Sequence, residues 1–360
     1  MKDSSFVVGY VPYSRDLSHP GDRRRLVVWA DSKNLKLNIS DPLKSDILVL
    51  SCESNFNYWI KKAECPVIID LIDGYLGEKT HWLKDIGRNV IRSFNGTSNL
   101  KYITFTRALK IACKSSDAII VSTQEQSETI KAFNENIYEI LDDHSELGNG
   151  LIKINQYSEN SEVRNFIFWE GFGYTLKHFK LISSELDEYL NSSSYRLCLV
   201  TNLTFARWGG YIGKVSTEDL IKKWFPKSFN KIIVVPWSIE NLVTYANKSR
   251  FAIIPIDTSD TFANLKPENK LLGLWSLNLP VIFSDTPAYR RVASQANLIF
   301  AISQADGWAE ALVSSEKIRS ENYLISANKY LETHHSQPIL IQKWDNAIRN
   351  TMSHTKSNSE

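Results

Sequence analysis

The chain has 360 residues, a length that suits two domains of ordinary size better than one core. With 43% hydrophobic and 23% charged residues, its composition is that of a soluble globular protein. Lysine and arginine number 42 against 40 acidic residues, so the formal charge of +2 argues against general nucleic-acid binding, which needs a basic surface.

The sequence also bears on localisation. Its N-terminus, MKDSSFVVGY, is too polar for a signal peptide, and no window approaches the roughly 20 apolar residues that span a bilayer. The four cysteines are scattered without metal-ligand spacing, so we expect free thiols in a cytoplasmic protein. A peripheral association with the inner face of the membrane stays open, since it needs only a surface patch.

In the first half of the chain, short aliphatic runs alternate with helical patterns. The runs span residues 6–11, 46–51, 66–73, 117–123 and 137–144. Because they are continuously apolar, they indicate strands covered on both faces, as in a parallel sheet. Their separation by helices indicates βαβ units.

The interval 145–165 is polar, contains glycine and has the weakest periodicity in the middle of the chain, so we place a domain boundary near it. The alternation then restarts. Further strands are predicted at residues 165–171, 195–202, 231–237, 251–257, 279–285 and 297–303. We also expect Ser238 to cap a helix.

The sequence thus predicts an α/β protein with two Rossmann-like, doubly wound domains, 1–155 and 156–335. Open sheets of this kind bind ligands beyond the carboxyl ends of their strands, so we expect the two domains to face each other across a cleft. A helix over 336–352 could pack back on the N-terminal domain, and the polar tail 353–360 is predicted to be disordered.

The stretch KPENKLLGLWSLNLPVIFSD, residues 266–285, places cations at the start of a predicted helix. Pro267 favours a first helical turn, whose free N–H groups and positive dipole can hold a phosphate. Lys266 and Lys270 would add charge, and Glu268 could accept hydrogen bonds from ribose hydroxyls. From composition alone, an ordinary helix start with exposed lysines is the more frequent explanation.

Residues 266–289 resemble the signature of GT-B glycosyltransferases, especially the retaining, nucleotide-sugar-dependent ones (glycosyltransferase group 1, or family 4-like). In that family an acidic residue, Asn-Lys-Leu, a helix and Pro-Val follow in this order. The resemblance implies that Lys270 binds the donor diphosphate and that Asn269 and Glu268 line the site. Many members carry a second glutamate one turn later, where this chain has Gly273, which leaves the ribose contact and the stereochemistry open.

The resemblance extends more weakly over the C-terminal half. It implies that Trp237 and Ser238 lie near the nucleobase and that Arg207 pairs with Lys270 at the diphosphate. An exposed loop arginine is an equally good explanation for Arg207. Gly171 and Gly173, after a predicted strand, would let the backbone approach a ligand.

In the N-terminal half, the loop GYVPYSRDLSHPGDRRRL (9–26) follows a predicted strand and is a candidate acceptor site. Its three consecutive arginines open a helix, where they oppose the dipole, which favours function over structure. The candidate acceptor-binding residues are Arg15, His19, Asp22, Arg23, Asp70 and Asp73. Asp73 or His19 could act as a base on an acceptor hydroxyl, although helix capping explains Asp73 equally well and a lone loop histidine is usually only solvated.

We therefore expect a metal-independent hexosyltransferase without a cofactor, whose predicted catalytic residues are Lys270, Arg207, Asp73 and His19. Its partners would be a nucleotide sugar and a saccharide or lipid-linked acceptor, and by analogy with the family its setting would be the assembly of bacterial surface polysaccharides. A sugar-nucleotide epimerase of the same fold and a non-catalytic nucleotide-sugar-binding protein remain alternatives. The sequence reveals neither the base nor the sugar.

Overall fold

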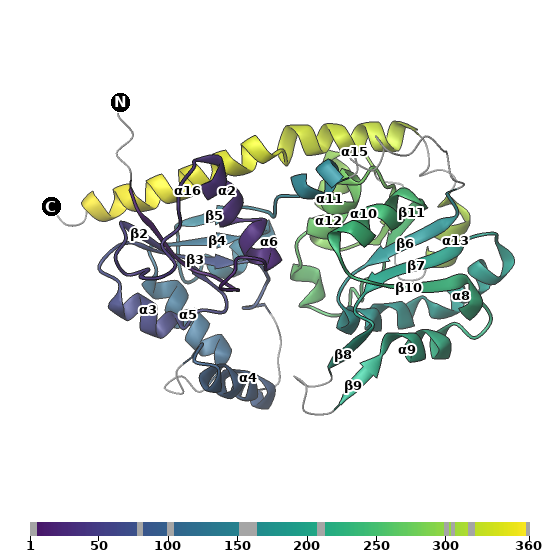
Figure 1. Cartoon of the computed structure of the whole chain (residues 1–360), viewed down its shortest axis with the longest axis horizontal. Helices are drawn as coiled ribbons and strands as arrows, with labels where there is room; N and C mark the ends of the chain where they lie inside the picture. Colours follow the sequence, from purple (N-terminus) through teal and green to yellow (C-terminus); the bar gives the residue numbers. More distant parts are fainter. Residues whose placement is uncertain are drawn as a thin grey trace. The chain divides into compact units, whose positions relative to one another are not determined.

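The computed structural model consists of two compact units (Figure 1). Unit 1 comprises Met1–Asp143, Leu265–Pro267 and His335–Glu360, and unit 2 comprises His144–Asn264 and Glu268–His334. The structure describes residues 6–77, 82–98, 104–150, 164–206, 213–298, 302–303, 307–315 and 321–357. The sequence boundary predicted near residue 155 lies in 151–163, outside the described residues.

Unit 1 is built on a five-stranded parallel sheet with the sequential order β1-β2-β3-β4-β5. Its strands are β1 (Val8–Val11), β2 (Ile47–Ser51), β3 (Val67–Leu71), β4 (Ala118–Val121) and β5 (Ile137–Glu139). Its helices are α1 (Pro20–Arg23), α2 (Leu26–Ser32), α3 (Phe56–Lys62), α4 (Trp82–Phe94), α5 (Phe105–Ser115), α6 (Gln124–Ile130) and α16 (Gln337–Ser357).

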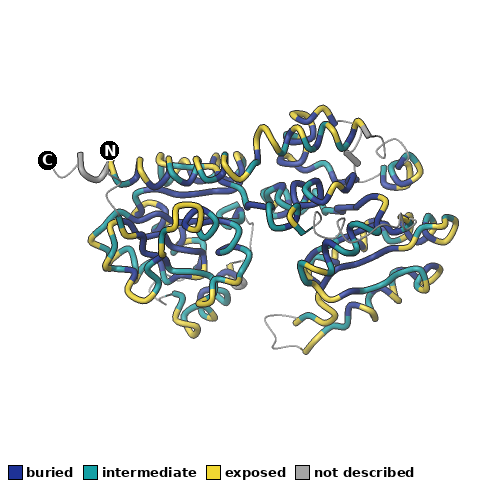
Figure 2. Tube along the Cα trace, turned by 45° about the horizontal axis from the view of Figure 1, so that its top comes forward, coloured by how far each residue is buried: buried dark blue, intermediate teal, exposed yellow. Residues whose placement is uncertain are grey.

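Both faces of this sheet are covered, which explains why its strands are continuously apolar. Alternate residues of a strand point to opposite faces. Accordingly, Ile47 and Val49 of β2 join a core cluster with α2 and α16, whereas Leu48 and Leu50 join a second cluster with α3 and α5. Figure 2 shows the buried strands, in dark blue, running through the middle of the unit.

The last helix, α16, packs on unit 1 although it is far from it in sequence. Trp344 and Ile348 are fully buried among side chains of α2 and the sheet. The indole Nε1 of Trp29 donates to Asp345 Oδ1 at 2.8 Å, and Lys33 pairs with the other oxygen of Asp345 at 2.6 Å. The helix continues to Ser357, five residues into the tail that the sequence predicted to be disordered.

His335 lies at the start of this C-terminal segment and is buried. Burial, together with the charge of Lys343, lowers the pKa of His335 from 6.5 to about 4. Between these two values the unfolded chain binds a proton that the folded chain does not. Stability is therefore highest above the unfolded pKa and falls as the pH drops from 6.5 toward about 4.

We expect the His335→Gln variant to lose most of the roughly 3 kcal/mol of acid destabilisation that the buried imidazole causes in the wild-type chain in this pH window. Denaturant unfolding across the window measures the effect. The neighbouring His334 is exposed, so His334→Gln should keep the wild-type pH dependence. An unchanged pH dependence in His335→Gln would show that another group is responsible.

Unit 2 contains a six-stranded parallel sheet and a short antiparallel hairpin of β8 (Thr204–Ala206) and β9 (Lys214–Ser216). The strands of the sheet are β6 (Phe166–Glu170), β7 (Arg196–Thr201), β10 (Ile232–Pro236), β11 (Ser249–Ile254), β12 (Val281–Ser284) and β13 (Ile302–Ser303). The α-helices are α8 (Ser183–Ser192), α9 (Thr217–Trp224), α10 (Ile239–Asn247), α11 (Asn269–Ser276), α12 (Pro287–Gln295), α13 (Trp308–Val313) and α15 (Glu321–His334). The 3-10 segments are η1 (Gly173–Leu181), η3 (Phe229–Lys231) and η4 (Ala263–Leu265), of which the last ends in unit 1.

The strand order in this sheet is β10-β7-β6-β11-β12-β13. Counted along the chain of the unit, this is the doubly wound order 3-2-1-4-5-6, in which the direction of winding reverses between β6 and β11. Ligands of such sheets bind beyond the carboxyl ends of the strands at this reversal. The topology alone therefore directs attention to the residues that follow Glu170 and Ile254.

Candidate functional site

Lys270 extends from the first turn of α11 to the carboxyl end of β6. Its ammonium donates to the carbonyl oxygen of Glu170 at 2.7 Å and lies 5.0 Å from the centroid of the Trp169 ring. The opposite side of α11 is anchored in the core by buried Leu271 and Trp275. The cation is thus directed toward the reversal point of the sheet and not into solvent.

Of the two glycines predicted to approach a ligand, Gly171 adjoins this lysine and Gly173 adjoins the β8–β9 hairpin. A Cβ atom at Gly171 would lie 2.9 Å from the Lys270 ammonium, and one at Gly173 would lie 2.3 Å from Cδ1 of Phe205. The backbone N–H of Gly173 donates to Asn202 Oδ1 at 3.1 Å. The absence of a side chain at Gly171 therefore allows the β6–η1 turn to approach the cation, and its absence at Gly173 allows the turn to approach Phe205 of the hairpin.

Glu268 precedes α11 and is buried, with 4% of its surface exposed. An oxygen of its carboxylate lies 3.7 Å from a guanidinium nitrogen of Arg291 on α12. Asn269 is the half-buried first residue of the helix. A Cβ atom at Gly273 would contact Leu147 at 3.3 Å and the His144 ring at 3.5 Å, so a glutamate there would require these side chains to move.

The predicted base-binding residues follow β10 at the same edge of the sheet. Ser238 is the N-cap of α10, as predicted, because its Oγ accepts a hydrogen bond from the Asn241 N–H at 3.0 Å. The side chain of Trp237 is 38% exposed. Arg207, the predicted partner of Lys270, lies outside the described residues.

Two aromatic residues at this edge were not predicted to have a role. Phe172 and Tyr174 flank Gly173, and each is 57% exposed. Their rings stack with centroids 5.7 Å apart and an interplanar angle of 6°. The run FWEGFGYT contains both aromatics, but it gives no indication that they are exposed.

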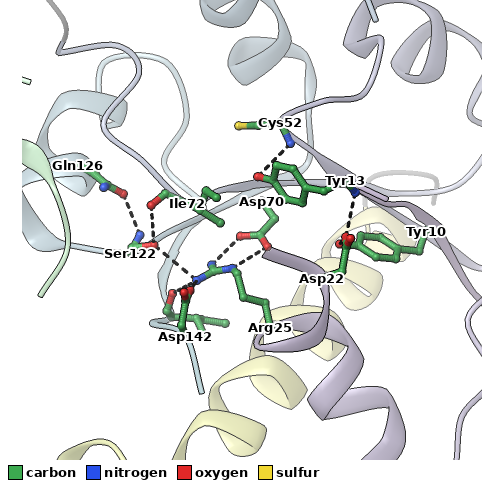
Figure 3. A network of polar contacts seen from close by, with 11 residues as sticks. Tyr10, Tyr13, Asp22, Arg25, Cys52, Asp70, Ile72, Ser122, Gln126 and Asp142 are labelled. Carbon is green, nitrogen blue, oxygen red and sulfur yellow. Dashed lines mark hydrogen bonds and ion pairs between the residues drawn. The ribbon is translucent and has the colours of Figure 1, made fainter. Parts of the chain in front are cut away.

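In unit 1, Asp22 lies within a closed set of hydrogen bonds (Figure 3). Its Oδ1 accepts from the Tyr10 hydroxyl at 2.6 Å and from the Tyr13 N–H at 2.8 Å, and its Oδ2 accepts from Ser14 N–H and Oγ. The carboxylate is fully buried. These contacts give Asp22 a structural role in holding the loop after β1, which differs from the acceptor binding predicted for it.

Asp70 is also engaged in a structural interaction. Arg25 binds both of its oxygens, at 2.8 and 2.6 Å, and also contacts Asp142 at 3.0 Å and the Ile140 carbonyl at 2.9 Å (Figure 3). Arg25 and Asp70 are each at most 1% exposed. This ion pair joins the start of α2 to the carboxyl ends of β3 and β5, although no local feature of the sequence distinguishes Arg25 from its two neighbours.

The other predicted acceptor residues lie at the surface of the same loop. Arg15 is exposed, and Arg23 donates to the Ser18 carbonyl at 3.1 Å. His19 caps α1, since its Nδ1 accepts from the Gly21 N–H, and it stacks on the Tyr13 ring at 4.8 Å. The accepted hydrogen bond fixes the proton of the neutral ring on Nε2.

Asp73 follows β3 and lies in the same unit as Lys266. Burial raises the pKa of Asp73, and the positive charge of Lys266 offsets part of that rise. The segment before Lys266 is held by unit 1, because the Gln126 side-chain amide donates to the Leu265 carbonyl at 3.0 Å. Lys266, predicted to bind the sugar donor, and Asp73, predicted to bind the sugar acceptor, therefore lie in the same unit.

Leu265 packs against Gly74, where an added Cβ would lie 2.5 Å from the Leu265 Cβ. We expect Gly74→Ala to destabilise the chain by about 1–3 kcal/mol in denaturant unfolding, because the 265–267 segment would have to shift. Gly87→Ala is the matched control, since a Cβ there meets nothing within 4 Å in a helix and should stabilise slightly. Equal stabilities of the two variants would contradict this packing.

No group of three or more His, Cys, Asp or Glu side chains in the described ranges is arranged to hold a metal ion. None of the helices in the part of the chain that the structure describes is both long and apolar enough to traverse a lipid bilayer.

No protein-family model and no curated protein matches this sequence. Solved structures do match. A glycosyltransferase from Rickettsia africae ESF-5 has a TM-score of 0.60 at 12% identity, with 96% of this chain and 98% of that chain covered. HepE from Anabaena, in complex with UDP and glucose, has a TM-score of 0.61 at 9% identity, with 96% and 100% covered. For TarM the TM-score is 0.56 at 10% identity, and the match covers 84% of this chain and 54% of TarM.

The chain has the GT-B fold of glycosyltransferases. The matches that cover 96% of the chain include both units, so the fold similarity is not confined to one sheet. The GT-B resemblance identified from residues 266–289 is thereby confirmed at the level of the fold. Within this fold, Lys270 lies at the reversal point of the second sheet.

Proposed function

We propose that the protein is a glycosyltransferase that moves a hexosyl group from a nucleoside diphosphate sugar to a hydroxyl of a saccharide or lipid-linked acceptor. The observation that carries the proposal is the Lys270 ammonium, directed toward the carboxyl end of β6 where the winding of the sheet reverses. The UDP and glucose in the HepE complex support a UDP-sugar as the first donor to test.

The reaction breaks the bond between C1 of the sugar and the diphosphate oxygen, and forms a bond between C1 and the acceptor oxygen. The acceptor hydroxyl releases its proton, and the departing nucleoside diphosphate gains negative charge. A fixed cation contributes most at the point where such charge develops. Lys270 and the N–H groups at the start of α11 would supply this stabilisation without a metal ion, and Arg207 stays the predicted second cation.

Asp73 is the proposed base for the acceptor hydroxyl. His19, the second candidate, could accept a proton at Nδ1 only after releasing its hydrogen bond from the Gly21 N–H. A raised pKa supports Asp73, because a carboxylate is a better proton acceptor when its conjugate acid is weaker. Arg15 and Arg23 remain proposed contacts for an anionic acceptor, such as a lipid-linked phosphate. We propose surface-polysaccharide assembly at the cytoplasmic side of the membrane as the setting.

Calorimetric titration with UDP, GDP and CMP, followed by transfer assays with sugar nucleotides of the base that binds, tests the proposal. We expect UDP or GDP to bind and its sugar to be transferred. Binding of CMP, a monophosphate, in place of both diphosphates, or binding of none of the three, would contradict the diphosphate assignment of Lys270.

A non-catalytic nucleotide-sugar-binding protein is the second candidate, and Gly273 is the observation that favours it. The second glutamate of the retaining enzymes is absent there, and His144 and Leu147 adjoin the position. Tight binding of a sugar nucleotide without hydrolysis or transfer, across a panel of saccharide and lipid acceptors, would establish this candidate.

A further inference from the structure

Helix α4 of unit 1 is amphipathic, but its polar side is the buried one. Asp85 and Asn89 are 5% and 1% exposed. The Asp85 carboxylate accepts from the Thr106 N–H at the start of α5, and Asn89 accepts from the Ser98 hydroxyl. A surface helix normally buries its apolar stripe. In α4 the polar stripe attaches the helix to the unit.

The cations of α4 take part in the same attachment. The Arg92 guanidinium donates to the carbonyls of Cys52 at 2.7 Å and Ser54 at 3.2 Å, and it lies 5.0 Å from the Phe105 ring. Arg88 lies 5.3 Å from the same ring. These interactions fix the rotation of α4 about its axis and leave Val90, Ile91 and Phe94 on the side away from Asp85 and Arg92. Trp82, the first residue of the helix, lies at its N-terminal end and half a turn around the axis from Ile91.

The apolar side chains of α4 are consequently exposed. Phe94 is 86% exposed, Trp82 is 61% exposed and Ile91 is 43% exposed, while Ile86 and Val90 between them are half-buried. Burial of large apolar side chains is a main source of stability, so leaving several in water forgoes considerable stability. Exposed apolar groups that gather on one element indicate an interaction surface.

The charge around α4 indicates what this surface contacts. The described side chains of α4 and α5 include five cations and one acid, although the whole chain is almost neutral, and Arg92 also pairs with Glu53 at 3.1 Å. On α5, the helix next to α4, Arg107, Lys110 and Lys114 are exposed at helical spacing. A helix with exposed aromatic residues beside a basic helix matches the interface of an anionic lipid bilayer.

We propose that α4 is a membrane-docking helix, with Ile91 and Phe94 on its exposed side, and Trp82 at its N-terminal end, entering the headgroup region of an anionic bilayer. Basic side chains of α5 add long-range attraction to the lipid charge. Because the polar side of α4 stays bound to unit 1, docking requires no unfolding of the helix. The proposal is independent of the transfer reaction, since it concerns where the protein is held and not what it transfers.

Co-sedimentation of the full chain with vesicles tests the proposal. We expect binding to vesicles of equal parts phosphatidylglycerol and phosphatidylcholine, much weaker binding to phosphatidylcholine alone, and a decline as salt is added. Arg107→Glu should weaken binding to the anionic vesicles. Failure of the wild-type chain to sediment with anionic vesicles would overturn the proposal, whatever the outcome of the transfer assays.

A double variant, Trp82→Ser with Phe94→Ser, should reduce the vesicle partition coefficient by about tenfold or more. Its matched control is Val313→Ser with Ile325→Ser, which replaces apolar residues that are 72% and 62% exposed on helices of unit 2 and should bind like the wild type. Circular dichroism and the unfolding midpoint check folding, and Ile91→Ser alone provides a second, milder variant.

Two results would contradict the assignment to α4. Equal loss of binding in the α4 and control variants would indicate a non-specific effect of surface hydrophobicity. A wild-type dimer that Phe94→Ser dissociates, without any vesicle binding, would show that α4 contacts a second copy or another protein and would overturn the membrane proposal.

Discussion

Lys270→Ala is expected to weaken binding of the nucleoside diphosphate by about 10–100-fold, as measured by calorimetry. One charge-assisted hydrogen bond to a phosphate contributes roughly 1.5–3 kcal/mol, and its loss lowers the affinity by this factor. The wild-type ammonium already contacts the Glu170 carbonyl and the Trp169 ring, so it is held at the end of β6 before any ligand arrives. Turnover should fall at least as far, because the same charge would stabilise the leaving group.

The control for this variant is Lys222→Ala, which removes an exposed lysine from α9 in the same unit. It should leave both nucleotide affinity and thermal stability unchanged. Because Lys270→Ala also removes a hydrogen bond to Glu170, its unfolding midpoint must be compared with that of the wild type. Unchanged affinity in a folded Lys270→Ala protein would show that the diphosphate binds elsewhere.

Arg25→Ala should destabilise unit 1 by about 3–5 kcal/mol, the usual cost of removing one partner from a buried ion pair. The substitution would leave the Asp70 carboxylate in the core without its bidentate partner and the Ile140 carbonyl without its donor. Urea unfolding followed by circular dichroism measures the loss. The expected value is a large share of the stability of an ordinary domain.

Arg23 offers a close control, because it is also an arginine and lies two positions before Arg25. Its guanidinium makes an exposed hydrogen bond to the Ser18 carbonyl, so Arg23→Ala should cost well under about 1 kcal/mol. If both variants were equally stable, the Arg25–Asp70 pair would contribute nothing net to folding.

The strands could be predicted well because both faces of each sheet are covered. The run 46–51 corresponds to β2 at Ile47–Ser51, and the run 231–237 corresponds to β10 at Ile232–Pro236. A strand that is buried on both sides must be apolar at every position, and this pattern is local in sequence. The position of Lys270 at the start of a helix could also be predicted, because that helix and the strand after it are contiguous in the sequence.

Long-range partners could not be predicted in the same way. Arg25 and Asp70 are 45 residues apart, and nothing in either local sequence identifies the other as its partner. The three arginines at 23–25 therefore suggested a common function, although burial separates Arg25 from the other two. Likewise, the amphipathic pattern of α4 defines two sides of a helix, but only the contacts of Asp85 and Arg92 show which side is buried.

The contribution of α16 to unit 1 has a consequence for synthesis on the ribosome. Trp344 and Ile348 complete the core on one face of the first sheet, yet they follow the whole of unit 2 in the sequence. The first unit therefore remains unfinished until after unit 2 has been translated, and the second unit can complete its own sheet earlier. An expression fragment that ends at Asp143 would expose Trp29 and Leu26, and should aggregate unless the terminal helix is supplied as a separate peptide.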